Sequence, residues 1–124
     1  MSKDELVVYA YAGCSTCKKA LAWLKVHGVS ARVVPIVEAP PPAKELEALI
    51  AQSGLPASKW WNTSGEAYRA LIAERGKEAI AKLDTRAVAR LLSENGKRIK
   101  RPVLVRGGRV LVGFREDAYA TLLP

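Results

Sequence analysis

Apolar residues along the chain follow two spacings, and the changes between them predict alternating strands and helices. Leu6–Ala10 is a short apolar run with β-branched residues, which is typical of a buried strand. Apolar residues then recur at helical spacing from about Ser15 to His27, and Gly28 follows as a helix-ending residue. Ala31–Val37 predicts a second strand, in which Pro35 favours a sheet edge. The short turn between helix and strand therefore predicts a parallel βαβ unit.

The middle of the chain is predicted to be helical. Pro40–Pro42 cannot continue a strand, and Lys44–Gln52 then carries apolar residues on one helical face. A second helix is expected after Ser64-Gly65. Asp84 is a good N-cap for a third helix, which ends near Asn95-Gly96.

The last part of the chain returns to β structure. Pro102–Arg106 and Arg109–Val112 flank Gly107-Gly108, which predicts a two-residue hairpin, and Glu116–Leu122 predicts a closing helix. This order predicts an α/β fold with a thioredoxin-like mixed four-stranded sheet, built as βαβ, helical insertion, β-hairpin and C-terminal helix. We expect one domain over residues 1–124, with its core at 1–38 and 97–124 and the insertion at 39–96.

Composition places the chain among soluble globular proteins, because 49% of its residues are hydrophobic and 26% are charged. No segment approaches the roughly 18 continuous apolar residues that a membrane span needs. Asp4 and Glu5 lie close to the N-terminus with no long apolar run behind them, so a signal peptide is not expected. We therefore expect a cytoplasmic protein without membrane partners, whose cysteines are normally reduced.

Cys14 and Cys17 are the only two cysteines, and their CxxC spacing falls where the first strand meets the first helix. The unpaired N–H groups at a helix start favour a thiolate, and Lys18 and Lys19 add positive charge nearby. Cys14 lies in the turn and is predicted to be the reactive thiol. Cys17 lies one turn further in and is predicted to close a disulfide with Cys14.

A CxxC pair can also have three roles other than redox chemistry. A structural zinc site would need two more ligands, and apart from carboxylates only His27 remains, so no metal is expected. A permanent disulfide across so small a loop would add little stability. Two inert cysteines in a helix turn stay an alternative, and redox chemistry is favoured over it.

Positive charge is concentrated near the end of the chain. The net charge is +8, and residues 96–115 contain no acid but seven cations: Lys97, Arg98, Lys100, Arg101, Arg106, Arg109 and Arg115. No nucleic-acid motif accompanies them, so direct nucleic-acid binding is not expected. The stretch could be a solvated face, an anion site near Cys14 or a docking face. Trp60 and Trp61 are neighbours, so on a helix one would enter the core and the other could contact a partner, with core packing favoured.

Motifs spread over nearly the whole chain resemble the arsenate reductase-like (ArsC/Spx/MgsR) family. They are Cys14–Leu24, Asn62–Gly65 with Tyr68-Arg69, Lys100–Val105 and Leu111–Phe114. The resemblance implies a thioredoxin-like fold with a helical insertion. It also implies one of two roles, because some members are glutathione- and glutaredoxin-dependent arsenate reductases, whereas Spx-type members are redox-sensing regulators that bind the RNA polymerase α subunit.

The resemblance also assigns roles to single residues. Cys14 matches the catalytic or sensing cysteine, and Cys17 matches the second cysteine of the Spx-type switch, which the glutaredoxin-dependent reductases lack. Arg101 matches an arginine that helps hold the oxyanion, with Lys18 as a further candidate for anion binding. Pro102 matches a proline beside the site that is usually cis.

Two departures count against arsenate as the substrate. Asn62 stands where the reductases have another arginine, and the Leu111–Phe114 run has no arginine where a third is expected. Losing two charge-assisted contacts weakens an oxyanion site.

We therefore expect a thiol–disulfide redox protein with Cys14 as nucleophile and Cys17 as resolving thiol. No bound cofactor is expected, and glutathione or a thioredoxin or glutaredoxin system is the expected reductant. Its partner would be a small thiol or a redox protein. The alternative is an Spx/MgsR-type regulator that binds the RNA polymerase α subunit, and the choice between enzyme and regulator stays open at this point.

Overall fold

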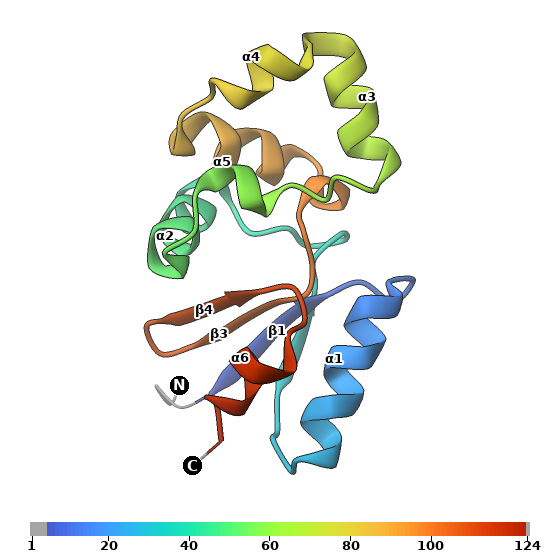
Figure 1. Ribbon diagram of the computed structural model, residues 1–124, viewed down its shortest axis with the longest axis vertical. Helices are drawn as coiled ribbons and strands as arrows, with labels where there is room; N and C mark the ends of the chain where they lie inside the picture. The colour runs from blue at the N-terminus through green and yellow to red at the C-terminus, as the bar shows by residue number, and fades with distance from the viewer. Residues whose placement is uncertain (1–4, 124) are drawn as a thin grey trace. The chain divides into compact units, whose positions relative to one another are not determined.

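The computed structural model describes residues 5–123, which divide into two compact units. The sheet unit contains the chain up to Pro35 and from Arg101 onward, and the helical unit contains Ile36–Lys100. Figure 1 shows strands only in the first of them. None of the helices in the described residues is both long and apolar enough to span a membrane.

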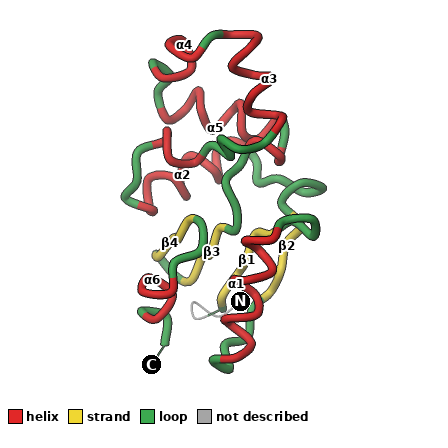
Figure 2. The backbone as a smooth tube through the Cα atoms, turned by 45° about the vertical axis from the view of Figure 1, so that its right-hand side comes forward, coloured by secondary structure: helices red, strands yellow, loops and turns green. Residues whose placement is uncertain are grey.

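Four strands form one mixed sheet in the sheet unit (Figure 2). They are β1 (Leu6–Ala10), β2 (Arg32–Pro35), β3 (Val103–Arg106) and β4 (Arg109–Val112), in the order β2-β1-β3-β4. β1 pairs in parallel with β2 and antiparallel with β3, which forms the hairpin with β4. This confirms the predicted α/β fold with a thioredoxin-like mixed sheet. β2 is an edge strand, which is where a proline such as Pro35 is tolerated.

Two helices, α1 (Ser15–Val26) and α6 (Glu116–Ala120), pack on one face of the sheet (Figures 1 and 2). Alternate residues of β1 point to this face because side chains alternate along a strand. The shared core consists of Leu6, Val8, Ala10, Cys17, Ala20, Leu24, Leu104, Tyr119 and Leu122. The three α1 residues among them recur at helical spacing, so the second cysteine of the CxxC pair belongs to the core face of α1.

α1 ends at a glycine, as predicted. Gly28 has φ 71°, a conformation that favours glycine, and its N–H donates to Lys25 O at 3.1 Å. His27 is the C-cap, and its ring stacks on Trp23 with 3.9 Å between centroids. The rings of Tyr119 and Trp23 meet edge to face, with 5.6 Å between centroids.

The helical unit contains α2 (Ala43–Ser53), α3 (Glu66–Arg75), α4 (Lys77–Ala81) and α5 (Thr85–Glu94), with the 3₁₀ helices η1 (Ala57–Trp60) and η2 (Gly96–Arg98). α5 begins as predicted, because the Asp84 carboxylate accepts the Ala87 N–H at 2.8 Å. α2 and α5 pack together through the buried residues Leu46, Leu49, Ile50, Val88, Leu91 and Leu92. α4 and the two 3₁₀ helices were not predicted.

Both adjacent tryptophans are buried, which agrees with the favoured core packing and leaves neither ring open to a partner. Trp60 is 0% exposed and Trp61 is 4% exposed. Trp60 ends η1 and Trp61 is already extended, forming an isolated bridge with Ile99. The change of backbone conformation between them lets both rings enter the core. The Trp60 Nε1–H donates to Ser53 Oγ at 3.2 Å.

Candidate redox site

Cys14 lies in the turn between β1 and α1 and is the N-cap residue of α1. Its N–H donates to Tyr11 O at 3.0 Å, which closes the turn, and its half-buried Sγ accepts the Cys17 N–H at 3.3 Å. The sulfur therefore takes the position that a capping oxygen takes in other helices. A negative charge on Sγ is favoured there, because it faces a helix N–H and the positive end of the macrodipole.

Arg101 is brought to Cys14 from the segment that leads into β3. The Arg101-Pro102 peptide bond is cis, and Pro102 is buried. Burial raises the pKa of Cys14, but hydrogen bonds from Cys17 and Arg101 and the positive charge of Arg101 outweigh it, so the pKa lies below the usual thiol value. The site thus combines a capped sulfur with a guanidinium.

Cys17 has the opposite environment from Cys14. Its side chain is 1% exposed and belongs to the core between α1 and the sheet. Burial, together with a hydrogen bond to Cys14 and the charge of Cys14, raises the pKa of Cys17 to about 12. Both cysteines are free thiols. The pair therefore releases its first proton from Cys14, while Cys17 keeps its own.

The raised pKa of Cys17 predicts a loss of stability in alkali. Unfolded Cys17 releases its proton near the ordinary pKa of 9.0, whereas folded Cys17 keeps it up to about 12. Between these two pKa values the folded state keeps the Cys17 proton and the unfolded state does not. The stabilisation that the protonated Cys17 gives the fold is therefore complete below pH 9.0 and disappears as the pH rises towards 12. We expect the free energy of unfolding of the reduced protein to fall by at most about 1.4 kcal/mol per pH unit from this group.

Denaturant unfolding at about pH 8 and about pH 10.5 measures this effect. Cys17→Ala is the matched control, because it keeps a small apolar side chain without a proton to lose. The fall in unfolding free energy should be smaller in the variant. An equal fall in both proteins would contradict the raised pKa.

Lys18, the other predicted anion-binding residue, is exposed on the first turn of α1. Within residues 5–123 its side chain has no hydrogen-bond or ion-pair partner, and it does not shift the pKa of either cysteine. Arg101 is therefore the cation that the structure brings to Cys14.

Other arginines of the basic stretch are held elsewhere. The Arg106 guanidinium donates to Leu122 O at 2.9 Å, and the Arg109 guanidinium donates to Thr121 O at 3.1 Å. Arg115 forms an ion pair with Asp117 at 2.9 Å. In the helical unit, Arg98 donates to Leu91 O at 2.8 Å. These arginines hold helix ends and the chain after α6, so they do not join Arg101 in one anion site.

Tyr11 is a site residue that sequence reasoning missed. The Arg101 guanidinium carbon lies 4.9 Å from the centroid of the Tyr11 ring. An aromatic residue three positions before the first cysteine was the only local signal, and it did not indicate a contact with a residue so distant in the sequence.

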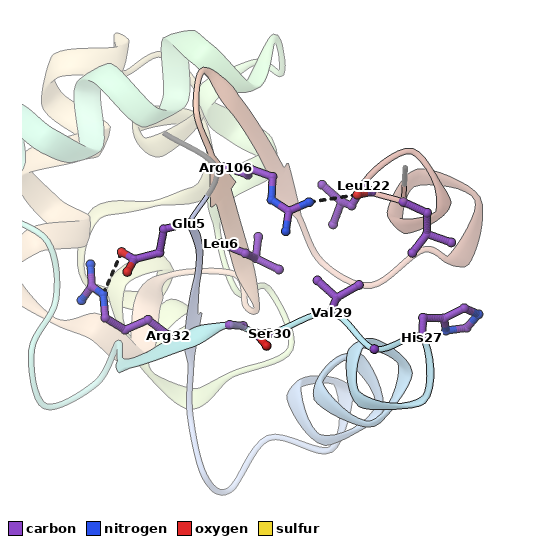
Figure 3. A pocket seen from close by; sticks show the side chains of 11 residues that line it. Glu5, Leu6, His27, Val29, Ser30, Arg32, Arg106 and Leu122 are labelled. Atoms are coloured by element: carbon purple, nitrogen blue, oxygen red, sulfur yellow. Dashed lines mark hydrogen bonds and ion pairs between the residues drawn. The ribbon is translucent and has the colours of Figure 1, made fainter. Parts of the chain in front are cut away.

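A separate hollow of about 600 Å³ lies at the other end of β1 from Cys14 (Figure 3). Leu6, Val29 and Leu122 line it, and the Arg106–Leu122 hydrogen bond and the Glu5–Arg32 ion pair lie at its wall. Neither cysteine lines this hollow. Within residues 5–123, no three histidine, cysteine or acidic side chains gather as a metal site.

Comparison with known proteins places the chain in a family. The ArsC family model matches residues 9–122. YusI, an uncharacterised protein of Bacillus subtilis, is 41% identical over 92% of this chain and 94% of its own length. The global transcriptional regulator Spx of Streptococcus agalactiae is 25% identical over 96% of this chain and 83% of its own length.

The solved structures agree with this placement. An ArsC family related protein from Bacteroides fragilis superposes with a TM-score of 0.88 at 34% identity, covering 98% of this chain and 99% of its own. Proteins of the ArsC family use thiol redox chemistry. The chain therefore belongs to the ArsC family and is a thiol redox protein.

Proposed function

We propose that the chain is a dithiol redox protein in which Cys14 attacks and Cys17 resolves. The observation that carries this proposal is the contrast between the two thiols. Cys14 Sγ is half-buried, capped by the Cys17 N–H and close to Arg101, whereas Cys17 is buried and its pKa is raised to about 12. A low-pKa thiol beside a protonated one suits a sequence of attack followed by resolution.

The proposed reaction has two exchange steps. The Cys14 thiolate attacks one sulfur of a substrate disulfide, forms a mixed disulfide and releases the other sulfur as a thiolate, which takes a proton from water. Cys17 then attacks Cys14 Sγ, which forms the Cys14–Cys17 disulfide and breaks the bond from Cys14 Sγ to the substrate sulfur. The proton that Cys17 gives up goes to the departing sulfur, which leaves as the second substrate thiol. The substrate gains two electrons and the protein loses two. A dithiol protein of the thioredoxin type, or two molecules of glutathione, would return them.

The first test is the selectivity of alkylation. With iodoacetamide near neutral pH, Cys14 should be modified at least about a hundredfold faster than Cys17, because the thiolate is the reacting form. Mass spectrometry of the digested protein separates the two sites. Unfolded protein is the control, in which both cysteines should react at similar rates. Equal rates in the folded protein would refute the assigned roles.

Mild peroxide distinguishes the dithiol cycle from a monothiol one. Treatment with peroxide and glutathione should give the Cys14–Cys17 disulfide, because Cys17 attacks oxidised Cys14 from within the same helix turn. A stable adduct of glutathione on Cys14 would remove Cys17 from the cycle. The reductant is then identified by adding either glutathione or a thioredoxin system to the oxidised protein. The effective donor is the one that restores both free thiols.

A second candidate function is redox-sensing regulation. It is favoured by the similarity to Spx over 96% of this chain and by the second cysteine of the pair. In this role the Cys14–Cys17 disulfide would change a surface that binds the RNA polymerase α subunit. Binding of purified α subunit by oxidised but not by reduced protein would support it. Equal binding in both states, or none in either, would count against it.

Arsenate is a weaker candidate substrate. The Asn62 amide donates to Lys97 O at 3.3 Å, and Asn62 Oδ1 accepts from Ser64 Oγ at 3.4 Å, so this side chain takes part in contacts within the helical unit. Of the cations in residues 96–115, Arg101 is the one that contacts Cys14, so the site lacks the several cations that an oxyanion site uses. Arsenate turnover with glutathione that Cys14→Ser abolishes would restore arsenate as a substrate.

A further inference from the structure

We propose that Tyr11 is a positioning residue that holds the Arg101 guanidinium against Cys14 by a cation–π contact. This inference rests on the proposed role of Cys14 as the attacking thiolate. Tyr11 lies in the turn before the cysteines. Its ring would act on Cys14 through Arg101, which comes from a distant part of the sequence.

The first observation is the contact between ring and guanidinium. The Arg101 guanidinium carbon lies 4.9 Å from the centroid of the Tyr11 ring, within the range for a cation–π interaction. Both side chains are half-buried, so water screens the contact less than it would at an open surface. An arginine side chain has several rotatable bonds, and a ring along one face of its guanidinium restricts them.

The second observation is that the turn leaves room for the Tyr11 ring at Gly13. A Cβ added at Gly13 would lie 3.0 Å from Tyr11 Cε2. Glycine at position 13 therefore leaves the space that the ring occupies, directly before Cys14 in the sequence. The ring therefore lies close both to the turn at Gly13 and to the Arg101 guanidinium.

The third observation is that the ring and the backbone of Tyr11 have separate roles. The Tyr11 carbonyl accepts the Cys14 N–H at 3.0 Å and closes the turn. Substituting the side chain leaves this hydrogen bond available. The effect of the ring on Arg101 can therefore be measured apart from the effect of the turn on Cys14.

The experiment compares the pH profile of Cys14 alkylation in Tyr11→Leu, Tyr11→Phe and wild type. Tyr11→Leu should slow alkylation below the pKa of Cys14 by about two- to fivefold, because the guanidinium is no longer held beside the thiolate. Tyr11→Phe keeps the aromatic face and should retain the wild-type profile. If Tyr11→Leu has the wild-type profile, or if Tyr11→Phe is as slow as Tyr11→Leu, the proposal is wrong.

Two further variants test whether Tyr11 acts through Arg101. In an Arg101→Gln background, Tyr11→Leu should have no additional effect on the profile, because the guanidinium it positions is gone. Gly13→Ala should displace the ring and slow alkylation in wild type but not in Tyr11→Leu. If the effects of the two substitutions on the alkylation rate simply add, in either double variant, the proposal is overturned. Far-ultraviolet circular dichroism checks that each variant is folded.

These measurements separate the inference from the function on which it rests. If wild-type Cys14 alkylates like an ordinary thiol, the proposed function fails. If wild-type Cys14 is activated and Arg101→Gln removes the activation while Tyr11→Leu does not, only the role of Tyr11 fails.

Discussion

The Cys14→Ser variant is expected to lose thiol–disulfide exchange down to the uncatalysed background. A serine hydroxyl stays protonated at neutral pH and does not attack a disulfide, so the first bond cannot form. The fold should survive, because serine is a preferred N-cap residue and position 14 is the N-cap of α1. This makes the variant a test of chemistry rather than of stability.

Cys17→Ser should stop the same reaction at a different step. Its Cys14 can still attack, but no neighbouring thiol releases the adduct, so a mixed disulfide accumulates. Reduced protein mixed with oxidised glutathione provides the assay, and mass spectrometry identifies the adduct on Cys14. Wild type should pass through this adduct to the Cys14–Cys17 disulfide.

Lys25→Gln serves as the matched control for both variants, because Lys25 is exposed on the last turn of α1, away from the cysteines. It should react like wild type. Residual exchange in Cys14→Ser that Cys17→Ser lacks would reverse the assigned roles of the two cysteines.

The Gly96→Ala variant is expected to reduce the free energy of unfolding by about 2–4 kcal/mol. A Cβ at position 96 would clash with Ile36 O and would lie 2.8 Å from Val37 Cα. Both neighbours are backbone atoms, which cannot rotate away as the end of a flexible side chain can. Position 96 is also buried at the start of η2, so the clash cannot be relieved into solvent.

Gly108→Ala is the matched control for Gly96→Ala. No atom lies within 4 Å of a Cβ at this exposed hairpin position, and the backbone there is not in the left-handed region. Its unfolding free energy should stay within about 0.5 kcal/mol of wild type. Denaturant titration of the three proteins gives the comparison. If Gly96→Ala loses no more unfolding free energy than Gly108→Ala, the close approach of position 96 to Ile36 is contradicted.

Much of the sheet unit could be predicted because local signals agree with tertiary structure there. Gly107-Gly108 marks the hairpin, and the β-branched run before Ala10 matches the buried face of β1. α4 could not be predicted in the same way. It has five residues with one buried side chain, Ile80, and that is too short for a hydrophobic period to emerge.

The candidate site was only partly visible in the sequence. CxxC spacing singles out Cys14 and Cys17, and the family resemblance singles out Arg101. The role of Tyr11 depends on a contact between segments that are far apart in the sequence, so no local pattern predicts it. The basic stretch is a case in which closeness in sequence does not mean a shared site. Neighbouring cations such as Arg106 and Arg109 share a segment but bond to different carbonyl groups.

The placement of the tryptophans gives the two units separate optical reporters. Trp23 is the only tryptophan in the sheet unit, whereas Trp60 and Trp61 both belong to the helical unit. The ring of His27 stacks on Trp23, so emission from this indole reports on the C-terminal end of α1. Phenylalanine at positions 60 and 61 would leave Trp23 as a single fluorophore. Comparing its unfolding curve with that of a Trp23→Phe variant, which reports on the helical unit, would show whether the two units unfold together or one after the other.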